Sequence, residues 1–468
     1  MSPDSSLCGQ EERQLQPPWY WILAFCLLCS ACARLPDLKY LKEPLNTPTT
    51  PRVVDGRGPL SEPEAASLLT RRLGRAKVDA KYLAGLEEAA TGRPLIAGNQ
   101  VTLLFDGPVT IAAMMAAVSA ARDSINLETY LFDQDPLGMR FADLLIAKQK
   151  EGVQVSIIYD CVGTLGTPQA FFDRMQEAGI RLLPFQPVSP HHKLLGWRIN
   201  NRDHRKVLVV DGRVAFTGGV NITASYARSS LFRSARKAKA VGWRDTHVQI
   251  EGPAVAALQW MFLDNWASQN EGSLPERDFF PTLAPAGDKV VRVLRSQPGS
   301  NHEIFKAYFV AIQGARTSIH IASAYFVPDV QISKALQAAA RRGIDVKVLL
   351  PGVSDSWLTT YGSHSFYQDM LDAGVRIYEL KTSVLHAKTA VIDGSWSTVG
   401  STNLDTRSFL HNKEVNVVIL GDAFGREMED AFQDDLKDSR EITPGTWQQR
   451  PYLQRLKEWC ARLASYWL

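Results

Sequence analysis

Hydrophobic and polar positions follow an order of helices and strands that occurs twice along the chain. In the first half, Ala-rich helical patterns and Gly turns lead into apolar strands at 121–135, 144–163 and 175–185. The second half repeats this order at 315–329, 336–355 and 370–380. Strands that alternate with helices predict an α/β fold with a mostly parallel sheet covered on both faces. The chain therefore contains an internal duplication.

This duplication divides the chain into segments. We expect two α/β domains, at 95–280 and 285–440, which pack as a pseudo-two-fold dimer with the active site at their interface. Residues 34–94 are expected to form a Pro/Thr-rich linker and an N-terminal helical region. Apolar residues at helical spacing in the tail, 441–468, predict an amphipathic helix that packs on the catalytic domain or contacts a membrane.

The repeat includes a polar cluster at the mouth of a strand. The sequence RDHRKVLVVDGRVAFTGGVN, residues 202–221, predicts a strand, an Asp-Gly turn and a second strand. The second half has LHAKTAVIDGSWSTVGSTN at 385–403. Both copies fit the pattern His-x-Lys-x4-Asp-x6-Gly-x2-Asn, through His204, Lys206, Asp211, Gly218 and Asn221 and through His386, Lys388, Asp393, Gly400 and Asn403.

This polar cluster has two possible interpretations, a protective strand edge or a catalytic site. A charged edge that protects a sheet from unwanted pairing would explain a single copy. However, His, Lys and Asn at a strand mouth have no packing role that Leu or Thr would not serve better, and both copies keep all three. An acidic residue also heads a later strand in each half, Asp245 in DTHVQIEG and Glu414 in EVNVVILG. The pattern therefore indicates chemistry.

The doubled motif resembles the signature of the phospholipase D superfamily. TGGVN, VGSTNLD, SAYFVP and the basic-aromatic tail RPYLQRLKEWCARLASYWL further resemble bacterial cardiolipin synthases. This resemblance implies two tandem phospholipase D-like α/β domains that act as a monomer. It also implies a phosphatidyltransferase that passes a phosphatidyl group through a phosphohistidine to phosphatidylglycerol, so that cardiolipin forms and glycerol is released.

Phosphodiester exchange requires a nucleophile, a proton donor for the leaving alkoxide and cations for the phosphate oxygens. Lys206 and Lys388 would hold the phosphate as point charges. The amides of Asn221 and Asn403 would add neutral donors. The acidic residues have no metal-ligand spacing, so we expect neither a metal ion nor another cofactor.

Two histidines from symmetric positions can divide the work as nucleophile and general acid. Sequence symmetry does not choose between them, but the resemblance implies His204 as the nucleophile and His386 as the acid. Each ring needs an acceptor at its far nitrogen, and we expect Asp245 to serve His204 and Glu414 to serve His386.

Two further aspartates, Asp211 and Asp393, belong to the motif and complete the predicted catalytic set. They precede Gly at tight turns, so a turn-forming role and a direct catalytic role are both open.

An apolar run near the N-terminus predicts that the enzyme is attached to a membrane. Trp19–Ala33 is an uninterrupted apolar-to-small run. It is shorter than the about 20 residues of a transmembrane helix and fits the core of a signal peptide. Its end, CSAC, resembles a bacterial lipoprotein processing site with Cys32 as the lipidated residue, and an uncleaved anchor is the competing reading. We therefore expect residues 1–33 to attach the protein to the bacterial cell membrane or envelope.

The net charge of +3 is less informative than its distribution. Basic segments with interleaved Trp and Phe flank the first motif at 191–206 and 228–244. They favour phospholipid headgroups, phosphatidylglycerol or phosphatidylethanolamine, over a merely solvated face or a nucleic acid.

Three alternative functions remain. If water accepts the phosphatidyl group, the protein is a phospholipase D that releases phosphatidic acid. A nuclease would use the same fold. A non-catalytic lipid-binding protein would be expected to have lost a His or Lys from one copy, whereas both copies are intact.

Overall fold

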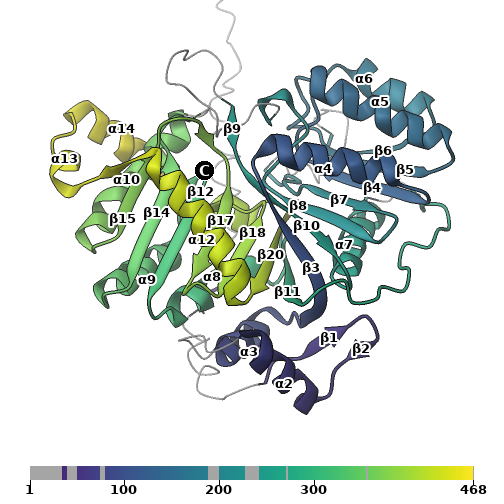
Figure 1. Ribbon diagram of the computed structural model, residues 1–468. Helices are drawn as coiled ribbons and strands as arrows, with labels where there is room; N and C mark the ends of the chain where they lie inside the picture. The colour runs from purple at the N-terminus through teal and green to yellow at the C-terminus, as the bar shows by residue number, and fades with distance from the viewer. Residues whose placement is uncertain are drawn as a thin grey trace, which may run out of the picture. The chain divides into compact units, whose positions relative to one another are not determined.

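A computed structural model describes residues 34–38, 50–73, 80–187, 200–226, 242–269, 272–354 and 357–466. The two halves of the duplication lie side by side, the first in blue and teal and the second in green and yellow (Figure 1). The predicted α/β class is confirmed.

In the first half, the sheet combines parallel and antiparallel strands. Three strands run parallel, namely β4 (Ser124–Thr129), β5 (Gln154–Asp160) and β6 (Arg181–Phe185). Antiparallel neighbours continue the sheet from β4 in the order β7 (Val207–Val210), β8 (Val214–Gly218), β10 (Thr246–Glu251) and β3 (Leu95–Phe105).

The second half repeats this arrangement. Its parallel strands are β12 (Ser318–Ser323), β14 (Asp345–Pro351) and β15 (Arg376–Leu380). Antiparallel neighbours follow from β12 in the order β17 (Lys388–Ile392), β18 (Trp396–Gly400), β20 (Glu414–Leu420) and β11 (Lys289–Ser296). The expectation of a mostly parallel sheet is therefore wrong. The Asp-Gly turns join β7 to β8 and β17 to β18 as hairpins, and such short connections link only antiparallel strands.

The two sheets meet at β3 and β11, which pair antiparallel through Asn99 and Lys289 and through Ile96 and Val291. Valines from both halves, among them Val209, Val291 and Val417, are buried in one core beneath this junction. The halves therefore share a core, which holds the mouths of β7 and β17 close to each other.

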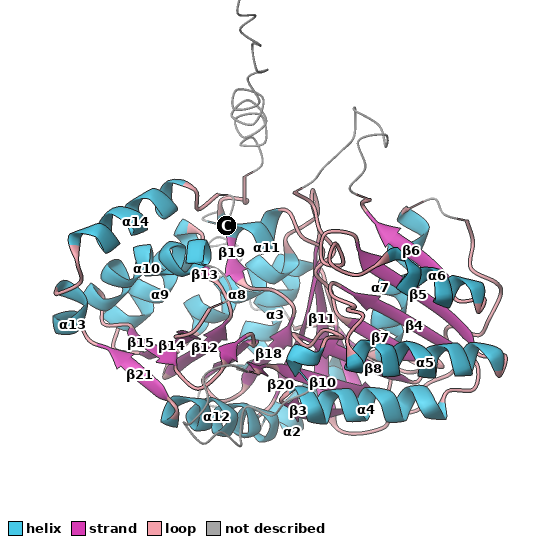
Figure 2. Ribbon diagram, turned by 90° about the horizontal axis from the view of Figure 1, so that it is seen from above, coloured by secondary structure: helices cyan, strands magenta, loops and turns pink. Residues whose placement is uncertain are grey.

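Helices cover the faces of this sheet (Figure 2). In the first half they are α4 (Gly107–Ala120), α5 (Pro136–Lys150), α6 (Gln169–Glu177) and α7 (Val255–Ser268). Their counterparts in the second half are α8 (Glu303–Gly314), α9 (Val330–Arg341), α10 (Trp357–Asp372) and α12 (Asp422–Lys437). A further short helix, α11 (Thr406–Leu410), follows the second motif.

Smaller elements complete the fold. At the N-terminal side these are β1 (Val53–Asp55), β2 (Gly58–Pro59), α2 (Glu62–Leu73) and α3 (Ala80–Thr91). The short strand pairs are β9 (Trp243–Arg244) with β16 (Val384–Leu385), and β13 (Phe326–Val327) with β19 (Leu404–Asp405). The chain continues through β21 (Ser439–Ile442), α13 (Pro444–Gln448) and α14 (Tyr452–Leu463).

The predicted N-terminal attachment segment, including Cys32, lies outside the described residues, as does most of both basic segments around the first motif. Among the helices that are described, none combines the length and the apolar character needed to cross a bilayer.

Candidate active site

Each histidine of the doubled motif lies on a loop that pairs with backbone of the opposite half. The backbone N–H of His204 donates to the carbonyl of Lys413, 3.0 Å away, and Lys413 donates back to Arg202 at 2.8 Å. In the same way, the N–H of His386 donates to the carbonyl of Arg244 at 2.8 Å. The second pairing extends the β9–β16 pair and the first surrounds a bridge between Asp203 and Lys413, so both histidines lie at the interface between the halves.

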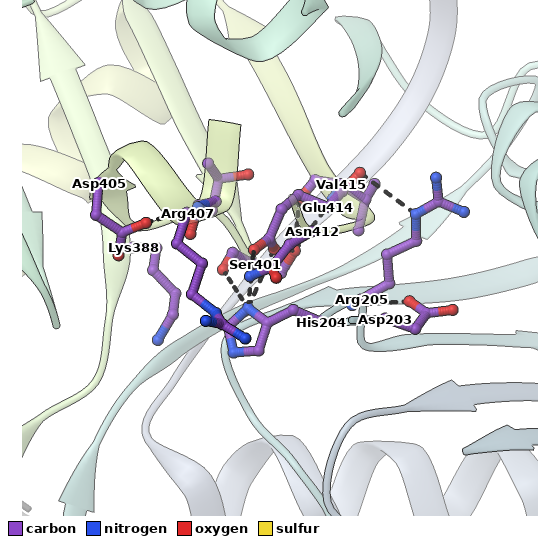
Figure 3. A network of polar contacts seen from close by, with 12 residues as sticks. Asp203, His204, Arg205, Lys388, Ser401, Asp405, Arg407, Asn412, Glu414 and Val415 are labelled. Carbon is purple, nitrogen blue, oxygen red and sulfur yellow. Dashed lines mark hydrogen bonds and ion pairs between the residues drawn. The ribbon is translucent and has the colours of Figure 1, made fainter. Parts of the chain in front are cut away.

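Both carboxylates predicted to orient the histidines do so, but each serves the ring of the other half. Nδ1 of His204 lies 3.1 Å from both carboxylate oxygens of Glu414 (Figure 3). Nδ1 of His386 lies 2.7 Å from Oδ2 of Asp245. The expected pairing of Asp245 with His204 and of Glu414 with His386 is therefore wrong. Because the histidine loops cross the interface, the nearest strand head belongs to the opposite half.

The carboxylate contacts define the protonation of the rings. A carboxylate accepts the Nδ1 proton, which leaves Nε2 unprotonated in the neutral ring. Burial lowers the pKa of His204, opposed by the charge of Glu414. Burial, reinforced by Lys388, lowers the pKa of His386 to about 4. Both rings are therefore neutral near pH 7 without a bound anion.

The carboxylates remain ionised although they are fully buried. Burial alone would raise the pKa of Asp245, but the contacts with His386, Lys388 and the backbone N–H of Thr246 together outweigh it, and the pKa is lowered. Burial would likewise raise the pKa of Glu414, but its contacts with His204, Lys206 and Ser401 lower it. Ser401 Oγ and the amide of Asn412 also donate to Glu414, so its remaining lone pairs are satisfied.

Both lysines of the motif lie beside the histidines. The ammonium group of Lys206 donates to the carbonyl of His204 and lies 5.3 Å from the ring centre of Tyr130. Burial lowers the pKa of Lys206 to about 7. Nζ of Lys388 lies 2.9 Å from Nδ1 of His386. An anionic group between the two lysines would favour their charged forms.

A cavity of about 430 Å³ lies between the halves and is lined by both histidines and both asparagines of the motif. Oδ1 of Asn221 accepts a hydrogen bond from the backbone of Leu131, and its amide faces the hydroxyl of Tyr226 at 3.5 Å. Oδ1 of Asn403 is buried without a hydrogen-bond partner among the described residues. A polar ligand in the cavity could therefore bind there.

Asp211 and Asp393 do not line this cavity, and their placement in the catalytic set is corrected. The carboxylate of Asp211 accepts from the backbone N–H groups of residues 122–124 at 2.8 to 3.2 Å. Asp393 makes the equivalent contacts with residues 316–318. Both residues have a φ of 52°, in the left-handed region that Asp tolerates. They tie the hairpin turn to the start of the neighbouring strand, at the far end from the histidines.

Sequence reasoning missed several residues of the cavity wall, namely Tyr130, Arg202, Trp243, Tyr325, Asp405 and Arg407. Arg407 donates to Asn200 at 2.7 Å, and burial raises the pKa of Asp405 to about 7. Trp243 lies against the ring of His386, with centroids 4.7 Å apart. The segment NLDTRS directly after the second motif contains two of these residues, and its charge was the available signal.

Across the described residues, no three or more His, Cys, Asp or Glu side chains form a group that could hold a metal ion. Arg202 and Arg407 are the lysine or arginine side chains among the described residues that line the cavity, and the motif lysines lie behind the histidines.

Comparisons with known proteins identify the family of this chain. The family described as "Cardiolipin synthase, PLD-like domain" matches residues 114–231 and 308–436. A "Cardiolipin synthase 2" of Bacillus cereus is 36% identical over 370 residues, which are 78% of this chain and 70% of that protein. A "Cardiolipin synthase" of Geobacillus kaustophilus is 36% identical over 376 residues, 80% of this chain and 73% of that protein.

A solved structure supports the fold alone. The phosphatidylserine synthase of Haemophilus influenzae has a TM-score of 0.61 at 12% identity, over 82% of this chain and 99% of that one. The family model and the sequence relatives show that this chain belongs to the cardiolipin synthase family of phospholipase D-like phosphatidyltransferases. The resemblance seen in the doubled motif is confirmed.

Proposed function

We propose that the protein joins two phosphatidylglycerol molecules to form cardiolipin and glycerol, through a phosphohistidine at His204. The observation that carries this proposal is one cavity with two histidines, each held at Nδ1 by a buried carboxylate of the opposite half. Such a pair provides a nucleophile and an acid–base group for the two halves of a transfer reaction.

In the first step, Nε2 of His204 attacks the phosphorus of the donor lipid. A P–N bond forms as the P–O bond to the glycerol headgroup breaks, and His386 gives its proton to the departing alkoxide. The pKa of His386 is low without substrate because the ring is buried beside Lys388. The negative phosphodiester favours the imidazolium, so substrate binding raises the pKa of His386 and the ring takes up from solvent the proton that this step needs.

The second step reverses the first with a new alcohol. A terminal hydroxyl of a second phosphatidylglycerol gives its proton to His386 as its oxygen attacks the phosphorus, and the P–N bond breaks. Lys206 and Lys388 bind the non-bridging oxygens in both steps, and the amides of Asn221 and Asn403 add donors. Asp245 and Glu414 keep each ring in the required tautomer.

A decisive experiment gives the purified protein phosphatidylglycerol vesicles and measures the products. Cardiolipin and glycerol in equal amounts are expected. Phosphatidic acid without cardiolipin would instead identify a phospholipase D and overturn the transferase proposal. Adding phosphatidylethanolamine as the labelled lipid shows whether it also serves as donor. Expression in cells without their own cardiolipin synthases provides the matching test of function in the membrane.

The intermediate has its own test. Protein mixed briefly with donor lipid labelled in its phosphate is expected to carry an acid-labile, base-stable label. This label should be absent from His204→Ala and retained by His320→Gln, which alters a histidine that Glu429 holds outside the cavity. Label on His204→Ala would overturn the assignment of the nucleophile.

We further propose that residues 1–33 attach the enzyme to the bacterial membrane, with Cys32 as the lipidated residue, and that the halves 95–280 and 285–440 act together in one monomer. Labelled palmitate that still enters the Cys32→Ser protein would overturn the lipoprotein assignment. Chromatography with light scattering tests the monomer.

A further inference from the structure

The last helix, α14, turns its apolar side outward. Tyr452, Leu456, Trp459 and Leu463 recur at helical spacing and form one stripe, which Leu453 widens. These five side chains are between 56% and 87% exposed. A surface helix of a globular protein normally turns such a stripe toward the core.

Polar contacts with the rest of the fold fix this rotation of α14. Glu458 is 3% exposed and accepts from Nε of Arg450 at 2.9 Å. Arg462 donates to the carbonyl of Ser365 at 2.9 Å and pairs with Asp369 on α10 at 3.1 Å. Turning the stripe inward would break these contacts and leave charged groups without partners. The outward apolar face is therefore built into the fold.

The apolar surface continues onto α10, whose Thr359 lines the cavity of the active site. Trp357 at the start of α10 is 70% exposed, and Tyr361 links it to Lys457 of α14 through ring contacts. Figure 2 shows α14 beside α10. At the other end, the ring of Tyr466 lies 5.6 Å from that of His411, which precedes the cavity residue Asn412.

Charge identifies the occupant of this surface. Arg455, Lys457 and Arg462 are exposed along the borders of the apolar stripe. Leu, Trp and Tyr between cations are typical of a helix that lies in the interface of a membrane with anionic lipids.

We propose that the outer face of α14, together with Trp357, docks on an anionic phospholipid bilayer and holds the cavity at the lipid surface. This proposal rests on the proposed function in one respect, that the substrates are bilayer phospholipids. It names a contact separate from the N-terminal segment. A second copy of the chain and residues 1–33 are the competing occupants.

The exposed thiol of Cys460 on α14 allows a local test. An environment-sensitive dye is placed there in the full chain, with the other cysteines changed to Ser. Phosphatidylcholine vesicles that contain phosphatidylglycerol are expected to shift its emission to the blue, and lipid-borne nitroxide to quench it. The same dye at Ser67→Cys on α2, with Cys460→Ser, is expected to respond to neither.

Each competing occupant gives a different result. An unchanged dye at position 460 on protein that sediments with the vesicles overturns the proposal. A blue shift without vesicles that grows with protein concentration indicates a second copy, and a blue shift at every concentration indicates residues 1–33. Either result also overturns it.

Activity provides a second readout. The triple variant Leu453→Ser, Leu456→Ser, Trp459→Ser is expected to need on the order of tenfold more phosphatidylglycerol vesicles for half-maximal rate, since it loses three apolar contacts. Its turnover of short-chain, monomeric phosphatidylglycerol should be unchanged. Trp260→Ser removes an equally exposed Trp from α7 and should leave both rates unchanged.

Two outcomes separate this proposal from the proposed function. Equal loss on both substrates by the triple variant, or an equal effect of Trp260→Ser, contradicts docking through α14. A wild-type protein that forms no cardiolipin but still shows the dye response at position 460 contradicts the proposed function and leaves the docking intact.

Discussion

The two copies of the motif have the same backbone frame but different surroundings. Around His204 the loop is charged: Asp203 and Arg205 are buried beside it. Around His386 the corresponding residues are Leu385 and Ala387, also buried. Duplication therefore preserved the reacting groups, whereas the structures that support them diverged.

Support for His204 comes from a buried polar network. Arg205 lies 3.5 Å from Glu128 on β4, and Asn265 on α7 donates to both Glu128 and Asp203. In the repeat, Ala322 stands at the position of Glu128. The loop of His386 instead packs its apolar residues, and Leu385 and Ala387 belong to a hydrophobic cluster with Phe432.

The residue that follows the motif glycine is Gly219 in the first copy and Ser401 in the second, and the two carboxylates explain this difference. Ser401 donates its hydroxyl to Glu414, whereas Gly219 leaves space for the carboxylate of Asp245. A Cβ at Gly219 would lie 2.0 Å from Oδ1 of Asp245. The longer side chain of Glu414 reaches its histidine past a serine, and the shorter Asp245 requires a glycine.

The largest expected effect comes from removing either histidine. His204→Ala and His386→Ala should each lower the rate of cardiolipin formation by a thousandfold or more, on the order of the loss of a nucleophile or its acid–base partner. The steps should differ: His386→Asn is expected to retain the labelled intermediate with an activated leaving group, and His204→Ala to lose it. Equal labelling of both variants would break the assigned division of labour.

Next come the crossed carboxylates. Asp245→Asn and Glu414→Gln should each lower kcat by roughly 100-fold to 10,000-fold, because the facing histidine loses its tautomer and orientation. Asp245→Asn should retain the labelled intermediate, as His386→Asn does. Glu414→Gln should lose it, as His204→Ala does. Burst kinetics of labelling distinguish the two patterns. The opposite match would contradict the crossed arrangement.

In the charged loop of His204, removing one partner of the Arg205–Glu128 ion pair should destabilise the protein more than removing both partners. Arg205→Leu leaves Glu128 buried without its ion-pair partner and is expected to lower the free energy of unfolding by about 3–5 kcal/mol. The double variant Glu128→Leu, Arg205→Leu should recover most of that loss. Urea denaturation measures both proteins. A double variant as unstable as Arg205→Leu would show that packing, rather than charge pairing, supports His204.

The second copy of the motif is followed by a titratable residue, Asp405, whereas the first copy has Thr223 at the corresponding position. The stability of the two copies should therefore depend differently on pH. Burial raises the folded-state pKa of Asp405 from 3.8 to about 7. Its contribution to stability is therefore fully present below pH 3.8 and is lost as the pH rises through 7. Between pH 5 and 8, Asp405→Asn should gain about 3 kcal/mol relative to wild type. Urea denaturation at pH 5 and at pH 8 tests this prediction. An equal change in the free energy of unfolding between the two pH values in wild type and variant would refute it.

The smallest effect is expected at the turns. Asp211→Asn and Asp393→Asn should each lower the free energy of unfolding by about 1 kcal/mol, because a weaker acceptor replaces the carboxylate that binds three N–H groups. kcat should stay near that of wild type. A large loss of kcat without loss of stability would return these residues to the catalytic set.

Much of this protein could be predicted from its linear pattern. Strand and helix periodicity, the Asp-Gly turns and the spacing from His204 to Asn221 are local features, and they recur from His386 to Asn403. Local features depend on neighbours in the chain, so two copies in register indicate one fold used twice and one chemistry that needs both. The family followed from the same residues.

Other properties arise only when distant segments meet. The partner of each histidine depends on which strand head its loop reaches, and the loops cross the interface to Asp245 and Glu414. The cavity wall at Arg407 and Trp243 combines residues from both halves. The outward stripe of α14 follows the same rule: its periodicity predicts an apolar face, but the ion pair of Arg450 with the buried Glu458 decides that this face points to the outside. Periodicity defines the faces of an element, whereas contacts between elements decide which face is buried.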